Sequence, residues 1–415
     1  MTGASTAFPT LRITIDGFEA QGSFAEAQAA WLNPDQATVA RLDELLADCN
    51  VGVLAHFYMD PELQGTLGGC GWPHIHISDS LAMADRGIAM AESGVSALTV
   101  LGVDFMSENV RAMLDAVGHD VLPVHRVARS AIGCSLAESA EALAYGAWLQ
   151  QAAQTPRSLH VIYINTSLMV KARAHALVPT LTCTSSNVVQ TVLQAFAQVP
   201  ELTLWFGPDT FMGNNLRQIF ASAAELDDAA IAALHPAHDR ASLRRLLAGL
   251  RTFEQGVCVV HHMFGADVTR RVREELPDAF YTAHLEVPGE MFALAAEAAL
   301  AGRGVVGSTS DILNFIGKQV DAALAEDKPA TLPFVLGTEA GMVTAIVRNV
   351  RQRLLASGRT DVVVDIIFPV AAEAIAATGE ADLALVPGVL GGEGCTPAGG
   401  CATCPYMKMN SLDAL

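Results

Sequence analysis

The chain has 415 residues, of which 51% are hydrophobic and 17% charged, and its net charge is −19. This length suits about two or three domains, and so acidic a surface repels phosphate backbones and anionic lipids, which disfavours nucleic-acid and membrane partners. Residues 1–10 lack the basic region and apolar core of a signal peptide, and no apolar run approaches the roughly 20 residues that cross a bilayer. We therefore expect a cytoplasmic protein.

Apolar runs that change abruptly to polar residues recur along the chain. A helix is predicted at 37–46, and the apolar run at 51–59 turns polar at His56. Later runs lie at 160–165, 202–207, 256–262, 279–286, 304–310 and 333–341, separated by helical stretches such as 221–234, 291–301 and 341–356. A short apolar run with a polar tip is typical of a buried parallel strand whose end carries function.

The alternation of such strands with helices predicts an α/β fold with parallel sheets. We divide the chain into an N-terminal extension at 1–35 and three α/β blocks at 36–135, 136–258 and 259–390. The Gly- and Cys-rich tail, 391–415, is too short to be a domain and is assigned to the first block. Because ligands bind beyond the carboxyl ends of parallel strands, we expect the strand tips of the three blocks to face one cleft.

The chain has eight cysteines: Cys49, Cys70, Cys134, Cys183, Cys258, Cys395, Cys401 and Cys404. Without a secretion signal they are read as thiols, metal ligands or catalytic groups rather than as disulfides. Thiolates suit soft metals and iron–sulfur clusters, and a cluster on three cysteines leaves one iron for a Lewis-acid role. The pattern alone leaves open both a metal centre and a set of buried structural thiols.

Two pairs of alternating polar residues stand at the ends of apolar runs. His56 and Tyr58 would point the same way on an extended chain, and so would Tyr163 and Asn165. For the first pair the simpler interpretation is a structural histidine and a packed tyrosine. The second pair favours a function, because a buried strand seldom carries two polar groups without partners.

Hydroxyl-rich turns precede several predicted helices and could bind a carboxylate or phosphate, or could simply cap the helix. These are Ser80 after Asp79, the CTSSN turn at 183–187 and the GSTS turn at 307–310. His261, His284 and Glu286 could transfer protons, since a dehydration needs an acid and a base. Two alternatives stay open: His284 and Glu286 form an H-x-E pattern that also resembles a hard-metal site, and the residues could form a surface ion pair.

Together these motifs resemble those of the quinolinate synthase family. The matching stretches run in the family's order from about residue 52 to residue 412: LAHFYMDPELQ, SDSLAMA, VDFMSENV, GCSLAE, YINTSLMVKA, CTSSN, GPD, GVCVVH, AHLEV, GSTS, GTEAGM and CPYMKMNSL. Each motif is weak by itself, but a dozen in this order is specific.

The resemblance implies three pseudo-symmetric three-layer α/β/α domains around a central cleft, and one 4Fe–4S cluster per chain held by Cys134, Cys258 and Cys404. It also implies a transferase that condenses iminoaspartate with dihydroxyacetone phosphate in de novo NAD biosynthesis, with the cluster as the Lewis acid. The products would be quinolinate, phosphate and water. Functional coupling to an aspartate oxidase or dehydrogenase that makes iminoaspartate would follow.

The resemblance also assigns roles to individual residues. The positions that match the family's catalytic residues are His56, Tyr58, Tyr163, His284 and Glu286. The positions that match its substrate contacts are His56, Ser80, Tyr163, Asn165, Ser185, His261, His284, Glu286, Ser308 and Thr309.

The chain also departs from the family. It has HLEV where HPEC is common, and Asp311 follows GSTS. Five residues separate Cys395 from Cys401, which argues against a regulatory disulfide between them. Two alternatives stay open: a metal protein that uses the tail cysteines alone, and a nucleotide-binding dehydrogenase, although no G-x-G-x-x-G follows the first strand.

Overall fold

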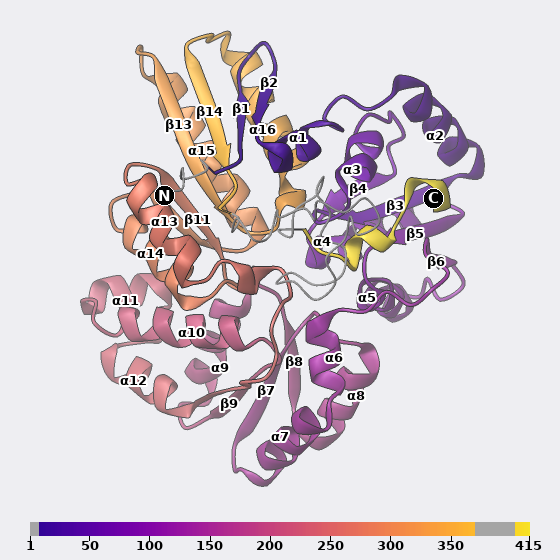
Figure 1. Cartoon of the computed structure of the whole chain (residues 1–415). Helices are drawn as coiled ribbons and strands as arrows, with labels where there is room; N and C mark the ends of the chain where they lie inside the picture. The colour runs from indigo at the N-terminus through magenta and orange to yellow at the C-terminus, as the bar shows by residue number, and fades with distance from the viewer. Residues whose placement is uncertain (1–7, 370–402) are drawn as a thin grey trace, which may run out of the picture. The chain divides into compact units, whose positions relative to one another are not determined.

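The computed structural model describes residues 8–369 and 403–415. The chain divides into two compact units, which we call unit 1 (Met1–Ile132 and Val259–Leu415) and unit 2 (Gly133–Cys258). The described residues form three mainly parallel sheets, two in unit 1 and one in unit 2, and helices flank each sheet (Figure 1). The predicted α/β class with helix–sheet–helix layers is confirmed. The predicted boundaries of three domains stay a prediction.

The first sheet of unit 1 has four parallel strands in the order β4-β3-β5-β6. Its strands are β3 (Val51–His56), β4 (Ile75–Ser78), β5 (Ala97–Leu101) and β6 (Val124–Arg126), and its helices are α2 (Gln36–Cys49), α3 (Pro61–Leu67), α4 (Ser80–Glu92) and α5 (Asp104–Ala116). Helix α2 begins where the Asp35 side chain accepts a hydrogen bond from Thr38 N, and it ends at Asn50, which has a left-handed backbone. These caps place the start of β3, so its tip falls at His56.

The sheet of unit 2 is parallel, in the order β10-β9-β7-β8. Its strands are β7 (Ser158–Tyr163), β8 (Thr180–Cys183), β9 (Thr203–Gly207) and β10 (Leu250–Thr252). Its helices are α6 (Ser135–Glu141), α7 (Leu143–Gln154), α8 (Leu168–Leu177), α9 (Val188–Gln198), α10 (Thr210–Ala223), α11 (Asp228–Leu234) and α12 (Arg240–Gly249). Helices α7 and α8 lie on one face of the sheet, and α9, α10 and α12 on the other (Figure 1).

The second sheet of unit 1 has the order β12-β11-β13-β14-β1-β2. Its parallel strands are β11 (Phe280–His284), β12 (Gly304–Gly307), β13 (Ala330–Gly337) and β14 (Val362–Ile367). The neighbouring helices are α1 (Ser23–Ala29), α13 (Ala266–Glu275), α14 (Gly289–Ala299), α15 (Thr309–Ala325) and α16 (Val343–Ser357). Aliphatic side chains of α15, α16 and the strands form its buried core.

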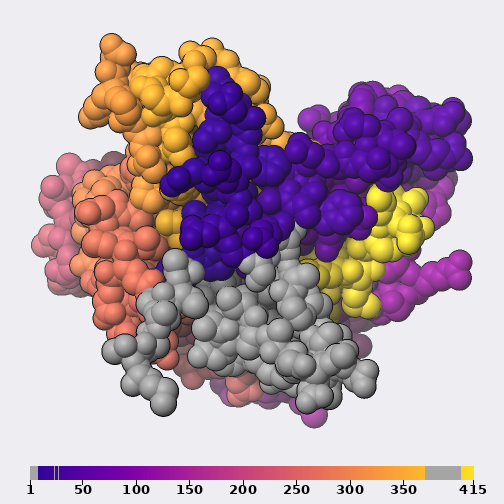
Figure 2. Space-filling model, turned by 45° about the horizontal axis from the view of Figure 1, so that its top comes forward, coloured from indigo at the N-terminus to yellow at the C-terminus, as the bar shows by residue number. Residues whose placement is uncertain are grey.

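Two N-terminal strands complete this second sheet, although we expect residues 1–35 to form an extension. Strands β1 (Thr10–Ile13) and β2 (Phe18–Gln21) pair antiparallel, and β1 pairs with β14. Arg12 makes two 2.9 Å hydrogen bonds with Asp365. Figure 2 shows the indigo N-terminal residues packed on the orange surface of this region. Four-residue strands are too short for their periodicity to stand out in the sequence.

Two predicted elements are wrong. The apolar run at 256–262 is not a strand: Gly256 makes an isolated bridge to Asp209, and the chain then passes from unit 2 into unit 1 and forms the 3-10 turn η1 (His261–Met263). The predicted helix at 221–234 is divided between α10 and α11, because the side chain of Asp227 caps the start of α11. Composition alone does not distinguish a buried strand from a segment that links two units.

The described tail, 403–415, lies in unit 1 as the turns η4 (Met407–Met409) and η5 (Leu412–Ala414). The side-chain amide of Asn410 donates a 3.2 Å hydrogen bond to Gly102 O, just after β5. Cys404 N bonds to Glu339 beyond β13, so the tail contacts both sheets of unit 1. Cys395 and Cys401 lie outside the described residues. Among the residues that are described, no helix has the length and apolar character to cross a membrane.

Candidate active site at the strand tips

The predicted polar residues lie at the carboxyl ends of parallel strands. In unit 1, His56 ends β3 and His284 ends β11, and in unit 2 Tyr163 ends β7. This is the edge of an α/β sheet at which ligands bind. The run of alternating polar residues in the sequence therefore marks real strand tips.

His56 and Tyr58 are held by one local hydrogen bond. The backbone N–H of Tyr58 donates to Nδ1 of His56 at 3.1 Å, and the two rings meet edge to face with centroids 4.8 Å apart. An imidazole whose Nδ1 accepts a hydrogen bond is neutral and carries its proton on Nε2. Burial also lowers the pKa of His56 to about 4. At neutral pH His56 is therefore a hydrogen-bond donor and not a base.

His284 and Glu286 repeat this arrangement at the end of β11. The backbone N–H of Glu286 donates to Nδ1 of His284 at 3.3 Å, and burial lowers the pKa of this histidine to about 3. Nδ1 also lies 3.8 Å from Oε1 of Glu286. Because the ring is neutral and Nδ1 already accepts a hydrogen bond, that contact is not an ion pair. His284 thus also keeps its proton on Nε2.

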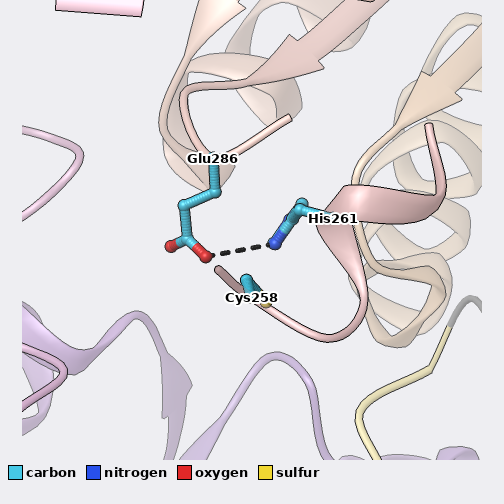
Figure 3. Close-up of side chains that lie close together, drawn as sticks. All are labelled: Cys258, His261 and Glu286. Carbon is cyan, nitrogen blue, oxygen red and sulfur yellow. Dashed lines mark ion pairs between the residues drawn. The ribbon is translucent and has the colours of Figure 1, made fainter. Parts of the chain in front are cut away.

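His261 joins Glu286 to the end of β13. Its Nδ1 lies 3.1 Å from Oε2 of Glu286, and its Nε2 lies 3.3 Å from Oγ1 of Thr338. Its ring stacks on His284 with centroids 4.8 Å apart. His261 is 1% exposed and Glu286 3%, so their interaction is sheltered from water and strengthened. Figure 3 shows the imidazole and the carboxylate facing each other.

Thr338 extends this connection to Tyr58. Its Oγ1 lies 3.0 Å from the phenol oxygen of Tyr58, which is only partly buried. The resulting order is Glu286 carboxylate, His261 imidazole, Thr338 hydroxyl and Tyr58 phenol. A carboxylate that orients an imidazole, which in turn hydrogen-bonds a hydroxyl, is the arrangement that hydrolases use to activate a hydroxyl. We call these four side chains the relay. It can carry a proton to or from Tyr58.

Unit 2 gathers its own predicted residues at one edge of its sheet. Tyr163 ends β7 and pairs in register with Cys183 at the end of β8. Asn165 follows the first strand and Ser185 the second, so both stand in loops at the same carboxyl edge. Tyr163 is 4% exposed, whereas Asn165 and Ser185 are half-buried. The structure thus brings these three together within unit 2.

Two of the predicted cluster cysteines stand where the chain passes between the units. Cys134 is the second residue of unit 2 and Cys258 is its last. The Ser135 hydroxyl, next to Cys134, donates a 2.9 Å hydrogen bond to the carbonyl oxygen of Val257, next to Cys258. Both cysteines are half-buried. Unit 2 therefore holds these two backbones side by side.

The third predicted ligand, Cys404, is held in unit 1. Its backbone N–H donates a 2.9 Å hydrogen bond to Oε1 of Glu339, which is 1% exposed. Burial raises the pKa of this carboxyl group to about 8, and the N–H groups of Cys404 and Gly341 oppose the rise. Cys404 is half-buried.

Two other cysteines have the properties of structural thiols. Cys183 is fully buried in unit 2, and burial raises the pKa of its thiol. In unit 1, burial and the Asp43 charge raise the pKa of Cys70 to about 11. A thiol with a raised pKa is a poor metal ligand at neutral pH, because the thiolate is the ligating form.

Cys258 also belongs to a second group of possible metal ligands. It stands three residues before His261, and three residues of chain reach at most about 10 Å, so its thiol stays near the His261–Glu286 pair (Figure 3). Thiol, imidazole and carboxylate together suit a single zinc ion. This donor set is an alternative to a cluster that uses Cys258.

The predicted anion-binding turns are helix starts. Ser80 is the first residue of α4, which Asp79 caps by accepting hydrogen bonds from two backbone amides. Ser308 caps α15: its hydroxyl accepts a hydrogen bond from Asp311 N and donates one to the Asp311 carboxylate, so the hydroxyl proton is already used. Thr309, the first residue of α15, is 4% exposed. Ser308 thus has a capping role that the sequence motif did not reveal.

Three buried residues that we do not predict complete the site. Thr338 and Glu339 directly follow β13, and Gln64 lies in α3. Thr338 and Glu339 have the signal that identifies His56, a polar tip after an apolar run, so the same rule could have found them. Gln64 has no such signal, because it lies within a short helix.

Acid and base groups at the tips of parallel sheets are typical of α/β enzymes. The profile of the family described as "Quinolinate synthetase A protein" matches residues 40–415, and the chain belongs to this family. A chloroplastic quinolinate synthase of Nicotiana tabacum is 53% identical over 98% of this chain, and one of Arabidopsis thaliana is 52% identical over the same share. A quinolinate synthase of Prochlorococcus marinus is 27% identical over 90% of this chain and 80% of its own length.

This chain spans 58% of the length of the Nicotiana and Arabidopsis relatives. Both are named chloroplastic, as is a 50% identical relative of Oryza sativa, and they point to the plastid. The expected cytoplasmic location is therefore wrong. That expectation depended on a search for an apolar leader, whereas chloroplast transit peptides are polar and rich in Ser and Arg, so the search could not detect one.

Proposed function

We propose that this chain is a quinolinate synthase: a transferase that condenses iminoaspartate with dihydroxyacetone phosphate to quinolinate, phosphate and water, in NAD biosynthesis. The relay carries the proposal, because forming the aromatic ring requires repeated proton transfer and loss of water. Family membership supports the same reaction.

The cofactor that the family implies is one 4Fe–4S cluster, with Cys134, Cys258 and Cys404 as its ligands. Their chemistry fits, since thiolates are the usual ligands of such clusters. The hydrogen bond between Ser135 and Val257 supports the first two as a pair, and the hydrogen bond from Cys404 to Glu339 supports a fixed backbone for the third. When bound on three cysteines, the cluster would supply a Lewis-acidic iron that polarises a substrate oxygen.

The protein's own groups would perform the acid–base steps. Tyr58 is the one relay member that is partly exposed, so it is the group that would exchange a proton with substrate. Glu286 would stabilise the positive charge that His261 acquires when it takes up the proton through Thr338. Tyr163, at the tip of β7, would be a second proton-transfer group.

Neutral histidines would orient the anionic substrates. His56 and His284 each keep a proton on Nε2, so they would donate hydrogen bonds to a carboxylate or carbonyl oxygen without adding a charge. The residues proposed for the remaining carboxylate and phosphate contacts are Ser80, Asn165, Ser185, His261, Ser308 and Thr309. Of these, Ser308 would have to turn its hydroxyl from Asp311 to the substrate. Iminoaspartate would come from an aspartate oxidase or dehydrogenase.

A single-metal protein is the second candidate function. The group of Cys258, His261 and Glu286 favours it, because one zinc ion would need no ligand from Cys134 or Cys404. The two candidates therefore differ in metal content and in the cysteines that they require.

Anaerobic purification with iron and sulfide analysis distinguishes them, together with an assay for quinolinate from iminoaspartate and dihydroxyacetone phosphate. We expect about four irons per chain and product formation. Cys134→Ser, Cys258→Ser and Cys404→Ser should each lose both, whereas Cys49→Ser, at an exposed position, should lose neither. A colourless protein with one zinc ion that survives Cys134→Ser and Cys404→Ser would refute the cluster and support the alternative.

A further inference from the structure

Glu339 is a buried carboxyl group whose two oxygens bond to two separate parts of the backbone. Oε1 accepts a 2.9 Å hydrogen bond from Cys404 N, and Oε2 accepts one of 2.9 Å from Gly341 N. The second bond caps the 3-10 turn η2 (Ala340–Met342) that follows Glu339. The first reaches 65 residues along the sequence to the tail. Capping alone would need one oxygen, so the other is available to fix the tail.

The end of β13 that carries Glu339 is itself rigid. The Nε2 atom of Gln64 lies 2.7, 2.8 and 2.6 Å from the carbonyl oxygens of Phe57, Met59 and Gly341. A Cβ atom on Gly341 would lie 2.7 Å from Tyr58 Cα, so the two backbones are in direct contact. Glu339 therefore ties the Cys404 backbone to Gly341, which packs directly on the segment that presents Tyr58.

The position of Glu339 in the sequence links its hydrogen bond with Cys404 to the relay. Thr338, the residue directly before it, hydrogen-bonds to Tyr58 and lies next to His261 in the relay. A shift of the Cys404 backbone would thus be transmitted to Glu339, and from there through one peptide unit to Thr338. The tail is also held at Asn410, whose amide donates to Gly102 O, so Glu339 fixes the end nearer the cysteine.

We propose that Glu339 is a positioning residue that sets the backbone of Cys404 for cluster binding and ties the tail to the Tyr58 segment. This inference depends on the proposed cluster. Whether or not the carboxyl group is protonated, each of its oxygens keeps a lone pair. Each oxygen can therefore accept the hydrogen bond from its own N–H partner, Cys404 or Gly341. A glutamine of the same shape replaces one oxygen with an NH2 group, which would face an N–H and could not accept its hydrogen bond.

The test compares Glu339→Gln with Glu339→Asp and with Thr338→Val in anaerobically purified protein. We measure iron and sulfide content, the rate at which a chelator removes iron, and hydrogen exchange of peptides covering 403–410 in the iron-free protein. We expect Glu339→Gln to lose iron about tenfold faster than the wild type, the effect of one hydrogen bond of about 1.4 kcal/mol. The 403–410 peptides of iron-free Glu339→Gln should exchange faster than those of the iron-free wild type.

A second substitution of Glu339 and one control variant separate positioning from general stability. Glu339→Asp is one methylene shorter and should also release iron faster. Thr338→Val should slow turnover but release iron at the wild-type rate, because the Thr338 side chain belongs to the relay and does not hydrogen-bond to Cys404. Combining Glu339→Gln with Cys404→Ser should add no further loss to that of Cys404→Ser alone.

Each outcome can be assigned. Wild-type protein without iron would defeat the proposed function itself. Wild-type protein with its cluster, but with the same iron-release rate and the same exchange of 403–410 in Glu339→Gln, would overturn the role of Glu339 and leave the proposed function intact. Should Glu339→Gln fail to fold, Glu339→Asp takes its place. Wild-type rates of hydrogen exchange and iron release in Glu339→Asp would then overturn the role of Glu339.

Discussion

Ser135 Oγ donates a 2.9 Å hydrogen bond to the carbonyl oxygen of Val257, which joins residues 122 positions apart. The two residues stand beside Cys134 and Cys258, where the chain enters and leaves unit 2. Adjacent Cα atoms are about 3.8 Å apart, so this one bond makes the two cysteine backbones near neighbours. The backbones of two proposed cluster ligands are thereby paired by a hydrogen bond within the protein.

Ser135→Ala tests this pairing. Losing one partly buried hydrogen bond should lower the free energy of unfolding by about 1 kcal/mol, and a chelator should remove iron faster because the two cysteines are less constrained. Ser139→Ala is the matched control, since the Ser139 hydroxyl bonds to the Ser135 carbonyl within α6. Equal iron-release rates in both variants and the wild type would contradict the pairing.

The relay predicts a defect in turnover without a defect in metal binding. Thr338→Val keeps the shape of the side chain but removes the hydroxyl between His261 and Tyr58, so kcat should fall by roughly 10²–10⁴-fold, the usual contribution of acid–base catalysis. Tyr58→Phe should give a similar loss. Thr338→Ser keeps the hydroxyl and should retain most activity. If Thr338→Val is as active as Thr338→Ser, at equal iron content, the relay is not used.

The strand tips of the site could be predicted from the sequence. An apolar run that ends in a polar residue indicates where a buried strand reaches the carboxyl edge of the sheet, at which ligands bind. His56, His284 and Tyr163 all end strands as that rule requires. The same rule failed at 256–262, where Val257, Cys258 and Val259 are only half-buried and the chain passes from unit 2 into unit 1 instead of forming a strand. An apolar composition alone does not tell these two cases apart.

Long-range hydrogen bonds could not be predicted at all. The bonds from Cys404 N to Glu339 and from Tyr58 to Thr338 join residues 65 and 280 positions apart, and no local pattern records such a partner. Ser308 shows a different limit of prediction from sequence, because a local motif can fit two roles. Its motif fits both an anion site and a helix cap, and the structure shows the cap.

Gly341→Ala should disturb the site by sterics alone. A Cβ atom there would lie 2.7 Å from Tyr58 Cα and 2.8 Å from Phe57 O, so the backbone of the Tyr58 segment would have to move. We expect a loss of about 1–3 kcal/mol in the free energy of unfolding, as for other overpacked sites, together with slower turnover.

Gly146→Ala is the control for this change. Gly146 lies within α7, and a Cβ atom added there would meet no neighbouring side chain within 4 Å. Alanine should therefore raise the free energy of unfolding by about 0.5–1 kcal/mol through its helix propensity. Denaturant unfolding of the two variants should thus shift in opposite directions. Equal shifts would show that Gly341 is not sterically constrained.

His160 predicts how the stability of unit 2 depends on pH. It is fully buried, its Nε2 lies 2.8 Å from the Tyr145 hydroxyl oxygen, and burial lowers its pKa to about 3. In the unfolded chain a histidine has a pKa of about 6.5. Between these two values the unfolded chain binds a proton that the folded chain does not. The free energy of unfolding should therefore fall as the pH drops below about 6.5, by up to roughly 1.4 kcal/mol per pH unit.

Urea unfolding at pH 7.5 and 5.5, followed by tryptophan fluorescence, measures this effect, since the Trp148 ring contacts His160. His160→Gln should be less stable than the wild type at pH 7.5 but should lose less stability on acidification, because its side chain does not titrate. His175→Gln, at an exposed position in the same unit, should keep the wild-type pH dependence. An unchanged pH dependence in His160→Gln would show that this imidazole takes up its proton at the same pH in the folded and unfolded protein, which would contradict the prediction.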